Sequence, residues 1–434
     1  MNLIANWKNA FDRLEAEGLA VLHEIEDEVT SFLDRLKQHL VENPEPIFAI
    51  LRRVAPILVV KNTAIVTRFE DVQEVLSRDQ VFQVTYQDKM EVVAGGPNFF
   101  LGMQNSPAYE RDHSHMLTVI RRQDIPEQVA PFVAAAAESL VKASDGEIEV
   151  VSQLAQLVPT RWIAKYFGCP SPSDADLVNW STATFQYLFA DLNDDATLAA
   201  AARDAAAKTR AWLDSSIAKR KVEIARPGAV PSDDVLNRCL ALQNAGVPGM
   251  DDVTIRTNLL GLFVGAIPTT SKCCTQALDE LLKRPEDLAR AQQAAASDND
   301  ALLADLVFEA LRFNPNNPVV VRVATEEYTL AKGSMRETLI PKGATAVAAT
   351  QSAMFDDRFV EVPNEIRTGR PSCIYMHFGY GLHTCFGQYI NRVQIPGILK
   401  PLLRRKNLRR AAGAAGQLTY SGPFPSSMTV QFER

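Results

Sequence analysis

Hydrophobic residues recur at helical spacing along most of the chain, and this spacing gives way to strand patterns after residue 312. Residues 8–42 place apolar positions among many charges, which predicts an amphipathic helix docked on the body of the protein; a membrane-surface or dimer contact is the alternative. Residues 127–310 are almost wholly helical in pattern. Three breaks interrupt that region, at residues 168–174, 225–234 and 244–252.

Strand patterns are short and flank the helical region. The β-branched stretches ILVV and TAIVTR, around Lys61-Asn62, predict a hairpin, and FEDVQEVLS predicts a short helix after it. Beyond residue 312 the stretches NPNNPVVVRVA, TLAKGSM and LIPKGATAVAA predict short strands and turns. We find no internal repeat and no long flexible linker, so the chain is predicted to be one mainly α domain at 46–434 with small β-sheets, preceded by a helical extension at 1–45.

Composition narrows the class of protein. The chain has 434 residues, 47% of them hydrophobic and 22% charged, as expected of a globular protein with a sizeable core. A net charge of −7 argues against a general nucleic-acid binder. The longest apolar runs are too short for a transmembrane segment, and the first residues carry charges where a secretory signal needs an apolar stretch. We therefore expect a soluble, cytoplasmic protein.

Chemistry is concentrated in one loop, HFGYGLHTCFG, at residues 377–387. The six cysteines form no CxxC pair and no zinc-ligand spacing, so most are expected to be buried, and Cys385 needs a chemical explanation. A helix is predicted at 387–402, and its free N–H groups and dipole would favour a thiolate at Cys385. A thiolate of this kind can serve as a metal ligand, and as an axial ligand of heme iron it favours O–O cleavage.

The stretch FGYGLHTCFG resembles the heme-binding signature of the cytochrome P450 family, Phe-Gly-x-Gly-x-His-x-Cys-x-Gly, at every fixed position. The resemblance implies a P450 fold, in which heme b (iron protoporphyrin IX) is buried between a distal and a proximal helix. It implies that Cys385 is the axial iron ligand, that His383 contacts a heme propionate and that Phe378 covers the sulfur. The glycines that shape the loop would be Gly379, Gly381 and Gly387.

More distant segments extend the resemblance over about residues 50–434. Glu309 and Arg312 match the family's Glu-x-x-Arg pair, a buried structural ion pair. Arg322 is similar to the strand arginine that contacts a propionate. Residues 110–122 stand where the family places a basic helix against the other propionate, with Arg111 and His115 at i,i+4 in reversed order.

A further departure concerns residues 363–370, PNEIRTGR, which occupy the family's Pro-x-Arg-Phe region. Glu365 stands where an arginine is usual, and Arg370 matches a later arginine. The group that closes the Glu309–Arg312 network therefore stays open from the sequence.

Residues 259–274, LLGLFVGAIPTTSKCC, resemble the family's distal helix. The usual pattern there is Ala/Gly-Gly-x-Asp/Glu-Thr-Thr, and this chain has Gly265-Ala266-Ile267-Pro268-Thr269-Thr270. The resemblance puts Thr269 at the position of the proton-relay alcohol, and Pro268 replaces the neighbouring acid. Reductive monooxygenation needs two protons at the distal oxygen, so the relay must use water, substrate or another residue.

The missing acid leaves two enzyme hypotheses open. The first is a monooxygenase that takes electrons from a separate ferredoxin or flavodoxin-like partner, which the basic run Lys400, Arg404, Arg405, Lys406, Arg409 and Arg410 could steer. The second is a peroxygenase or hydroperoxide-rearranging enzyme, because a peroxide arrives already reduced. The third hypothesis is that the protein is a non-enzymatic heme sensor. A hydrophobic small-molecule substrate is expected from the apolar candidates for the pocket, which are Phe99, Phe100, Phe263, Val264, Ile267, Val319, Val320 and Phe424.

Overall fold

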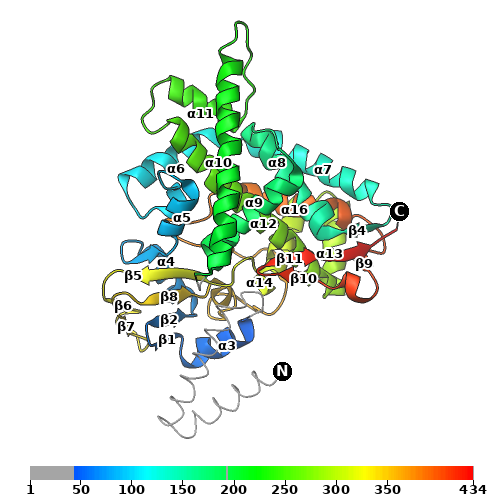
Figure 1. Ribbon diagram of the computed structural model, residues 1–434. Helices are drawn as coiled ribbons and strands as arrows, with labels where there is room; N and C mark the ends of the chain where they lie inside the picture. Colours follow the sequence, from blue (N-terminus) through cyan, green and yellow to red (C-terminus); the bar gives the residue numbers. More distant parts are fainter. Residues whose placement is uncertain (1–43, 192–193, 434) are drawn as a thin grey trace. The chain divides into compact units, whose positions relative to one another are not determined.

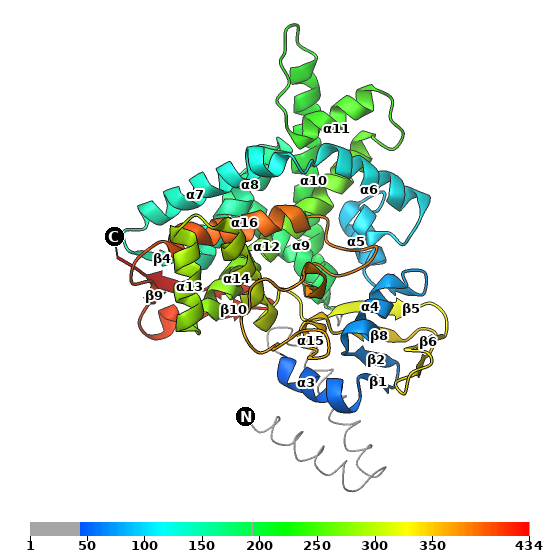
Figure 2. The same ribbon diagram turned by 180° about the vertical axis from the view of Figure 1, so that it is seen from behind.

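The structure is a computed structural model that describes residues 44–191 and 194–433 (Figures 1 and 2). These residues form two compact units. Unit 1 contains residues 44–85, 317–365 and 370–382, and unit 2 contains residues 86–316, 366–369 and 383–433 apart from the two that are not described. The amphipathic helix predicted at 8–42 lies outside the described residues, and the domain limits 1–45 and 46–434 stay a prediction.

Unit 1 is built on a five-stranded sheet with strand order β1-β2-β8-β5-β3. The predicted hairpin is confirmed, because β1 and β2 pair antiparallel and Lys61 turns between them with a φ of 52°. β8 pairs parallel with β2 and antiparallel with β5. The elements of this unit are α3 (Glu45–Val54), β1 (Ile57–Val60), β2 (Thr63–Val66), α4 (Phe69–Ser77), β3 (Phe82–Val84), β5 (Val320–Ala324), β6 (Tyr328–Leu330), β7 (Thr338–Ile340), β8 (Thr345–Ala348), α15 (Thr350–Ala353) and η5 (Ser372–Ile374).

Unit 2 carries most of the helices, and α12 (Asp252–Leu282) packs against α8, α9, α10, α14 and α16 in its interior (Figures 1 and 2). Two small sheets join β10 to β11 and β4 to β12 and β9. The other helices are α5 (Gln87–Ala94), η1 (Phe100–Gly102), α6 (Pro107–Val119), η2 (Ile125–Val129), α7 (Ala130–Ala143), η3 (Val151–Ala155), α8 (Leu157–Phe167), α9 (Asp174–Phe185), η4 (Gln186–Ala190), α10 (Ala196–Ile224), α11 (Val235–Asn244), α13 (Pro285–Ala296), α14 (Asp300–Phe313), α16 (Gln388–Leu403) and η6 (Gly413–Gly416). Its strands are β4 (Glu147–Glu149), β9 (Arg409–Arg410), β10 (Thr419–Ser421), β11 (Phe424–Ser427) and β12 (Thr429–Gln431).

The three predicted breaks in the helical region are confirmed, and side-chain caps explain where the helices begin. Ser173, Asp234 and Asp251 precede α9, α11 and α12, and each side chain accepts a hydrogen bond from a backbone N–H of the first turn. Gly168 ends α8 with a φ of 71°, a conformation that a side chain would strain. Short polar residues and glycine therefore set these boundaries, as their positions in the sequence indicate.

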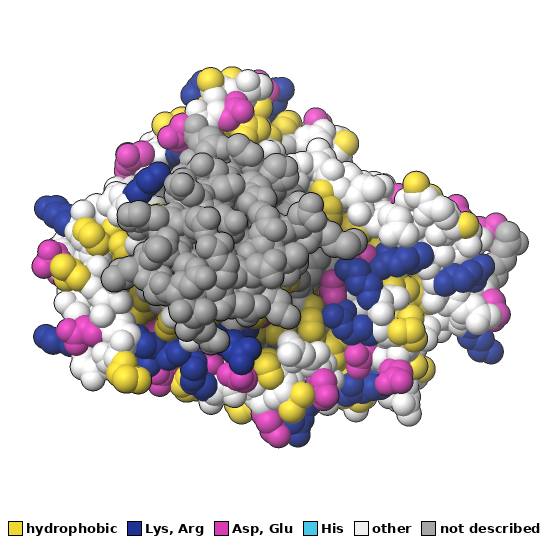
Figure 3. All heavy atoms as spheres, turned by 90° about the horizontal axis from the view of Figure 1, so that it is seen from below, with side chains coloured by type: hydrophobic (Ala, Val, Ile, Leu, Met, Phe, Trp, Pro, Cys, Tyr) yellow, Lys and Arg dark blue, Asp and Glu magenta, His cyan; other side chains and the backbone are white. Residues whose placement is uncertain are grey.

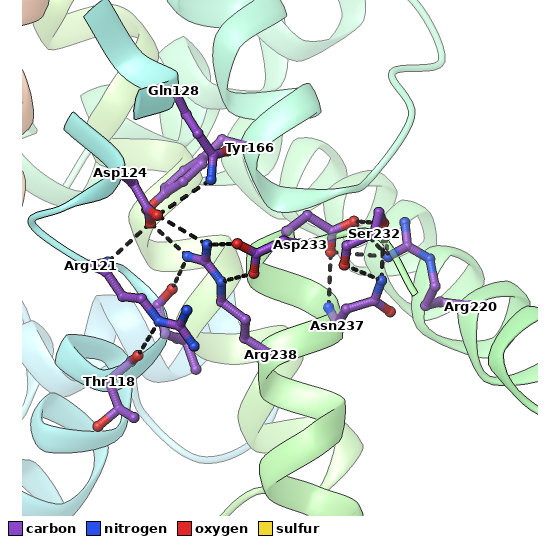
Figure 4. A network of polar contacts seen from close by, with 12 residues as sticks. Thr118, Arg121, Asp124, Gln128, Tyr166, Arg220, Ser232, Asp233, Asn237 and Arg238 are labelled. Carbon is purple, nitrogen blue, oxygen red and sulfur yellow. Dashed lines mark hydrogen bonds and ion pairs between the residues drawn. The ribbon is translucent and has the colours of Figure 1, made fainter. Parts of the chain in front are cut away.

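A buried arginine ties α11 to the segment before η2 (Figure 4). Nη1 and Nη2 of Arg238 donate to Asp124 over 2.6 and 3.0 Å, and Nε and Nη2 donate to Asp233 over 2.6 and 2.8 Å. The hydroxyl of Tyr166 also donates to Asp124, over 2.5 Å. Burial alone would raise the pKa of Asp124, but the hydrogen bonds from Arg238 and Tyr166 outweigh it and lower that pKa.

Charges of both signs share the surface. Lys and Arg side chains stand beside Asp and Glu side chains over the face drawn in Figure 3. Among the helices of the described ranges, 44–191 and 194–433, none has the length and apolar character needed to span a membrane.

The Arg238 network offers a matched pair of substitutions, because its two carboxylates differ in exposure: the Asp124 side chain is 3% exposed and that of Asp233 is 67% exposed. Asp124→Asn should lower the free energy of unfolding by about 3 kcal/mol, since it removes one member of a buried ion pair. Asp233→Asn should lower it by less than about 1 kcal/mol. Chemical denaturation measures both, and equal losses would contradict the assignment of the buried pair as the stabilising one.

Candidate active site

The cysteine loop begins in unit 1 with two glycines in the left-handed region. Gly379 and Gly381 have φ values of 75° and 74°. A Cβ at Gly381 would lie 2.3 Å from the carbonyl oxygen of Leu76, at the end of α4. Position 381 therefore tolerates no side chain, because both its dihedral angle and its close approach to backbone require glycine.

The reactive end of the loop lies in unit 2, where Cys385 precedes α16. The helix begins at Gln388 with Gly387 as its N-cap, which agrees with the helix predicted at 387–402. Burial raises the pKa of the Cys385 thiol, and the Gly387 N–H, which donates to the sulfur, acts in the opposite direction. The helix start thus supplies backbone dipoles that stabilise a negative sulfur.

One stripe of α12 is partly exposed within an otherwise buried helix. Between Gly261 and Thr275 every residue is buried except for five: Leu262, Gly265, Ala266, Thr269 and Cys273. At 100° per residue these five fall within an arc of about 100°, so they form one face. A Cβ built at Gly265 meets no heavy atom within 4 Å. Cys273, at the C-terminal end of the stripe, lies within electrostatic range of Cys385.

The large apolar residues predicted to line the pocket from α12 lie away from this stripe. Phe263, Val264 and Ile267 are fully buried and fall on the opposite side of the helix. The ring of Phe263 packs edge-on against Trp212 of α10, with centroids 5.4 Å apart. The prediction chose these residues by hydrophobicity, whereas close packing assigns them to the core and leaves small residues on the open face.

Thr269 lies on the stripe and Pro268 is buried beside it. The Thr269 hydroxyl donates to the Gly265 carbonyl over 2.5 Å, so its oxygen remains able to accept a hydrogen bond from the stripe side. Pro268 has no N–H to donate to the Val264 carbonyl, yet α12 continues through it as a helix. Thr270 faces another way and donates to Asn391 of α16 over 3.1 Å.

The residues of α6 that reach the cysteine loop differ from those predicted. Tyr109 and His113 stack on each other with centroids 5.5 Å apart. Tyr109 meets the ring of His383 at 5.8 Å, and His113 meets that of Phe386 at 5.5 Å. Phe100 completes this aromatic cluster, with its ring 5.2 Å from Phe386. Burial lowers the pKa of His113, which favours its neutral form.

Arg111 and His115 do not join that cluster. Arg111 is 41% exposed, its Nε donates to Asp112 over 2.7 Å, and its side chain lies against Gly249. His115 falls on another side of α6, and its buried Nδ1 has no hydrogen-bond partner among the described residues. The apolar positions Tyr109, Met116 and Val119 mark the buried side of α6, and that periodicity could have identified His113.

The remaining pocket candidates of unit 2 are buried aromatic residues. Phe99 covers Gly261 of α12, where a Cβ would lie 2.3 Å from the ring, and its own ring is 4.4 Å from that of Phe100. Phe424 of β11 packs edge-on against Phe185 of α9 at 5.6 Å. These contacts bring Phe99 to α12 and Phe100 to the cysteine loop.

Besides the loop glycines, four predicted site residues belong to unit 1. Val319 packs in the hydrophobic core with Phe48, Leu51 and Val347, so the structure assigns it to the core of that unit. Arg322 is buried on β5, Val320 is half-buried, and Phe378 lies in the loop. The contacts of Arg322, Val320 and Phe378 with a heme bound at Cys385 stay predictions.

Glu309 and Arg312 form an ion pair at the end of α14 that is completely buried, with exposures of 0% for both side chains. Two hydrogen bonds of 2.9 Å join the guanidinium to the carboxylate. The backbone N–H of Arg367 also donates to Glu309 over 2.9 Å. The sequence did not show which group of residues 363–370 joins the Glu309–Arg312 pair, and in the structure it is this backbone amide. The side chain of Arg370 instead donates to backbone carbonyls of unit 1.

The basic run near the C-terminus is largely neutralised. Lys400 and Arg404 pair with Asp298, Arg405 pairs with Glu138, and Arg410 pairs with Asp279. Four of the six basic residues are thus paired, whereas Lys406 and Arg409 are exposed and form no ion pair with the described residues. The run therefore gives weaker support to the predicted steering of an acidic partner than its sequence indicates.

These features fit a heme held through Cys385. The sulfur stands at a helix start with a backbone N–H directed at it, and Cys273 shows that the α12 stripe runs near it. Gly265 and Ala266 leave room for a flat ring on that stripe. No group of His, Cys, Asp and Glu in the described residues is arranged to hold a bare metal ion instead.

Comparisons with known proteins agree with this arrangement. A family model described as "Cytochrome P450" matches residues 181–413, more than half of the chain. "Cytochrome P450 144" of Mycobacterium tuberculosis is 25% identical, covering 91% of this chain and 88% of that protein. "Psi-producing oxygenase A" of Emericella nidulans is 24% identical over 83% of this chain, which spans only 38% of that protein.

A further relative and a solved structure complete the comparison. A "Bifunctional dioxygenase (DOX)-epoxy alcohol synthase (EAS)" of Fusarium oxysporum is 23% identical over 83% of this chain, which spans 32% of it. The structure of P450BioI in complex with an acyl carrier protein ligated to hexadec-9Z-enoic acid superposes with a TM-score of 0.77 at 20% identity, covering 92% of this chain and all of that one. The predicted fold is confirmed by this likeness.

The aromatic cluster yields a prediction for cofactor retention. His113→Ala removes ring contacts to Tyr109, Phe100 and Phe386, each worth about 1 kcal/mol. About 1.4 kcal/mol of this loss, roughly half, should fall on the heme-bound state, so heme should dissociate about tenfold faster. Transfer of heme to excess apomyoglobin, followed by absorbance, measures the rate. Arg111→Ala is the control on the exposed side of α6 and should leave the rate unchanged; the opposite order would support the role first predicted for Arg111.

Proposed function

The chain belongs to the cytochrome P450 family, and on that premise we propose that it is a heme-thiolate monooxygenase acting on a hydrophobic small molecule. The observation that carries the proposal is the position of Cys385 directly before α16, the helix that Thr270 of α12 reaches through its hydrogen bond to Asn391. We further propose heme b as the cofactor, a ferredoxin or flavodoxin-like protein as the separate electron donor, and a cytoplasmic location.

The heme would supply the oxygen-activating iron, and the protein would control its surroundings. Cys385 would hold the iron through its sulfur, while the Gly387 N–H withdraws electron density from that sulfur by hydrogen bonding. Gly265 and Ala266 keep the stripe flat enough for a ring and a substrate to share it. His383, whose ring contacts that of Tyr109, would orient one edge of the heme.

Thr269 has a restricted role in this arrangement. Because its hydroxyl hydrogen is directed at the Gly265 carbonyl, the oxygen can accept a hydrogen bond from a water or an oxygen-bearing ligand on the stripe. It therefore positions such a ligand and passes on a proton only after receiving one. The five stripe residues include no carboxylate, so the proton must come from elsewhere.

A second function, peroxide use or hydroperoxide rearrangement, is favoured by the same lack of an acid at position 268. Pro268 is buried, and no acid replaces the missing one on the stripe. One relative is named a dioxygenase joined to an epoxy alcohol synthase, and epoxy alcohols are isomers of unsaturated hydroperoxides. A hydroperoxide substrate would need no net proton and no electron donor.

The identity of the ligating sulfur is directly testable. Cys385→Ala should lose the absorption band characteristic of a thiolate-ligated ferrous carbonyl complex, because no other sulfur is placed at the start of α16. Cys373→Ala, at an exposed cysteine of unit 1, is the control and should keep the band. Retention of the band in Cys385→Ala would overturn the site assignment.

The two functions differ in their oxidant. With NADPH, a surrogate ferredoxin and its reductase, we expect product from members of a panel of hydrophobic substrates, at a rate at least about tenfold above that with peroxide alone. Product analysis by mass spectrometry measures both rates. Turnover with peroxide or fatty-acid hydroperoxides, and none with the electron-transfer proteins, would favour the second function.

A further inference from the structure

α12 contains a buried lysine for which the described part of the chain provides no polar partner. Lys272 is 4% exposed as a whole residue; its ammonium makes no hydrogen bond or ion pair with any of the described residues, and its Nζ keeps some accessible surface. Buried ammonium groups are ordinarily paired, because losing hydration without compensation is costly. In the same unit the buried cations Arg238 and Arg312 have carboxylate partners. Burying Lys272 therefore costs folding free energy, and packing alone does not explain its position.

The position of Lys272 relates it to the stripe. It follows Thr269 by three residues, so the two lie about 60° apart around the helix axis. Side chains of a helix lean toward its N-terminus, and a long side chain at 272 extends over the turn of Pro268 and Gly265. Lys272 is thus one helical turn after Pro268, the residue that stands in place of the acid, and lies about 20° from Gly265 around the helix axis.

A second unsatisfied polar group lies one turn further along the same flank. The Oε1 of Gln276 is buried and has no hydrogen-bond partner among the described residues. Its Nε2 donates over 2.9 Å to Asn314, a half-buried residue at the end of α14. Thr269, Lys272 and Gln276 therefore follow one another at steps of three and four residues along α12, and the hydrogen bond from Gln276 continues this line to Asn314.

Burial lowers the pKa of Lys272 to about 8, and the neighbouring Cys273 thiol is the one group of the described residues that acts against this shift. A group with a pKa near neutrality exchanges its proton readily at physiological pH, which suits it to proton transfer. An ordinary lysine, with its much higher pKa, would hold its proton.

We propose that Lys272 is the proton source of this site, acting through Thr269 in place of the acid that Pro268 replaces, and that it is reprotonated along Gln276 and Asn314. This inference rests on the monooxygenase function proposed above. That reaction joins substrate, O2, two electrons and two protons to give hydroxylated product and water. An N–H bond of Lys272 breaks, the proton passes by way of Thr269 and water to the oxygen that leaves as water, and the neutral amine takes a new proton from solvent.

Peroxide provides an internal control, because substrate and H2O2 give hydroxylated product and water with no net proton. Lys272→Met should reduce product formed per NADPH by about tenfold or more, with the electrons diverted to released peroxide. Its peroxide-driven turnover should stay within about twofold of the wild type. Lys208→Met makes the same change on exposed α10 and should alter neither quantity.

A rescue experiment separates proton supply from structure. Pro268→Asp introduces a carboxylate one turn before position 272, and the double variant Lys272→Met with Pro268→Asp should regain most of the lost product per NADPH. A merely structural role for Lys272 would lower both kinds of turnover, and the added acid would not restore them.

Stability gives a readout that involves no catalysis. Because the folded-state pKa of Lys272 is lowered, the unfolded chain binds more protons between about pH 8 and the ordinary lysine pKa of 10.5, so stability due to this group rises with pH in that window. The difference in melting temperature between the wild type and Lys272→Met should therefore shift in favour of the wild type as the pH rises from 7.5 to 9.5, about two pH units that span the lowered pKa. A constant difference would overturn the proposal.

The outcomes distinguish the two levels of inference. If the wild type shows no reductant-driven turnover, the proposed function fails, and the role of Lys272 fails with it. If the wild type is active and Lys272→Met keeps its product per NADPH within about twofold, only the role of Lys272 fails.

Discussion

Close packing around α12 is the constraint on which the rest of the site depends. A 31-residue helix packed among many others has few positions at which a ligand could approach it, and between Gly261 and Thr275 those positions form one stripe of mostly small residues. α12 and α16 are joined by the hydrogen bond from Thr270 to Asn391, and Cys273 at the end of the stripe lies within electrostatic range of Cys385. Without the surrounding packing, the stripe would be an ordinary helix face, and glycine at 265 would only weaken the helix.

Much of the fold follows from local rules that a sequence shows directly. The hairpin at Lys61, the caps at Ser173, Asp234 and Asp251, and the start of α16 after Gly387 all involve residues whose conformational preferences act over a few positions. The buried Glu309–Arg312 pair needed the family resemblance, because its spacing alone is common on exposed helices.

What the sequence could not supply was orientation and pairing. Phe263 and Ile267 are the right kind of residue for an apolar pocket, yet both lie on the far side of α12. Arg111 has the charge expected near a propionate, but α6 turns His113 and Tyr109 toward the cysteine loop. The charges of Lys400 and Arg404 are countered by Asp298, which is 106 residues away from Arg404 in the chain. Each miss reflects a contact between segments distant in sequence.

The approach of Gly381 to the Leu76 carbonyl has a consequence for how this chain can change. The Leu76 carbonyl in the last turn of α4 lies directly against the loop at Gly381. The length of α4 and the geometry of the loop are therefore coupled, although α4 carries no reactive group. Inserting one residue into α4 would rotate its terminal carbonyls by roughly 100° and remove the contact with Gly381. The Leu76 carbonyl oxygen should thus limit which insertions unit 1 tolerates. As the sequence diverges, the length of α4 should stay constant, although this helix performs no chemistry.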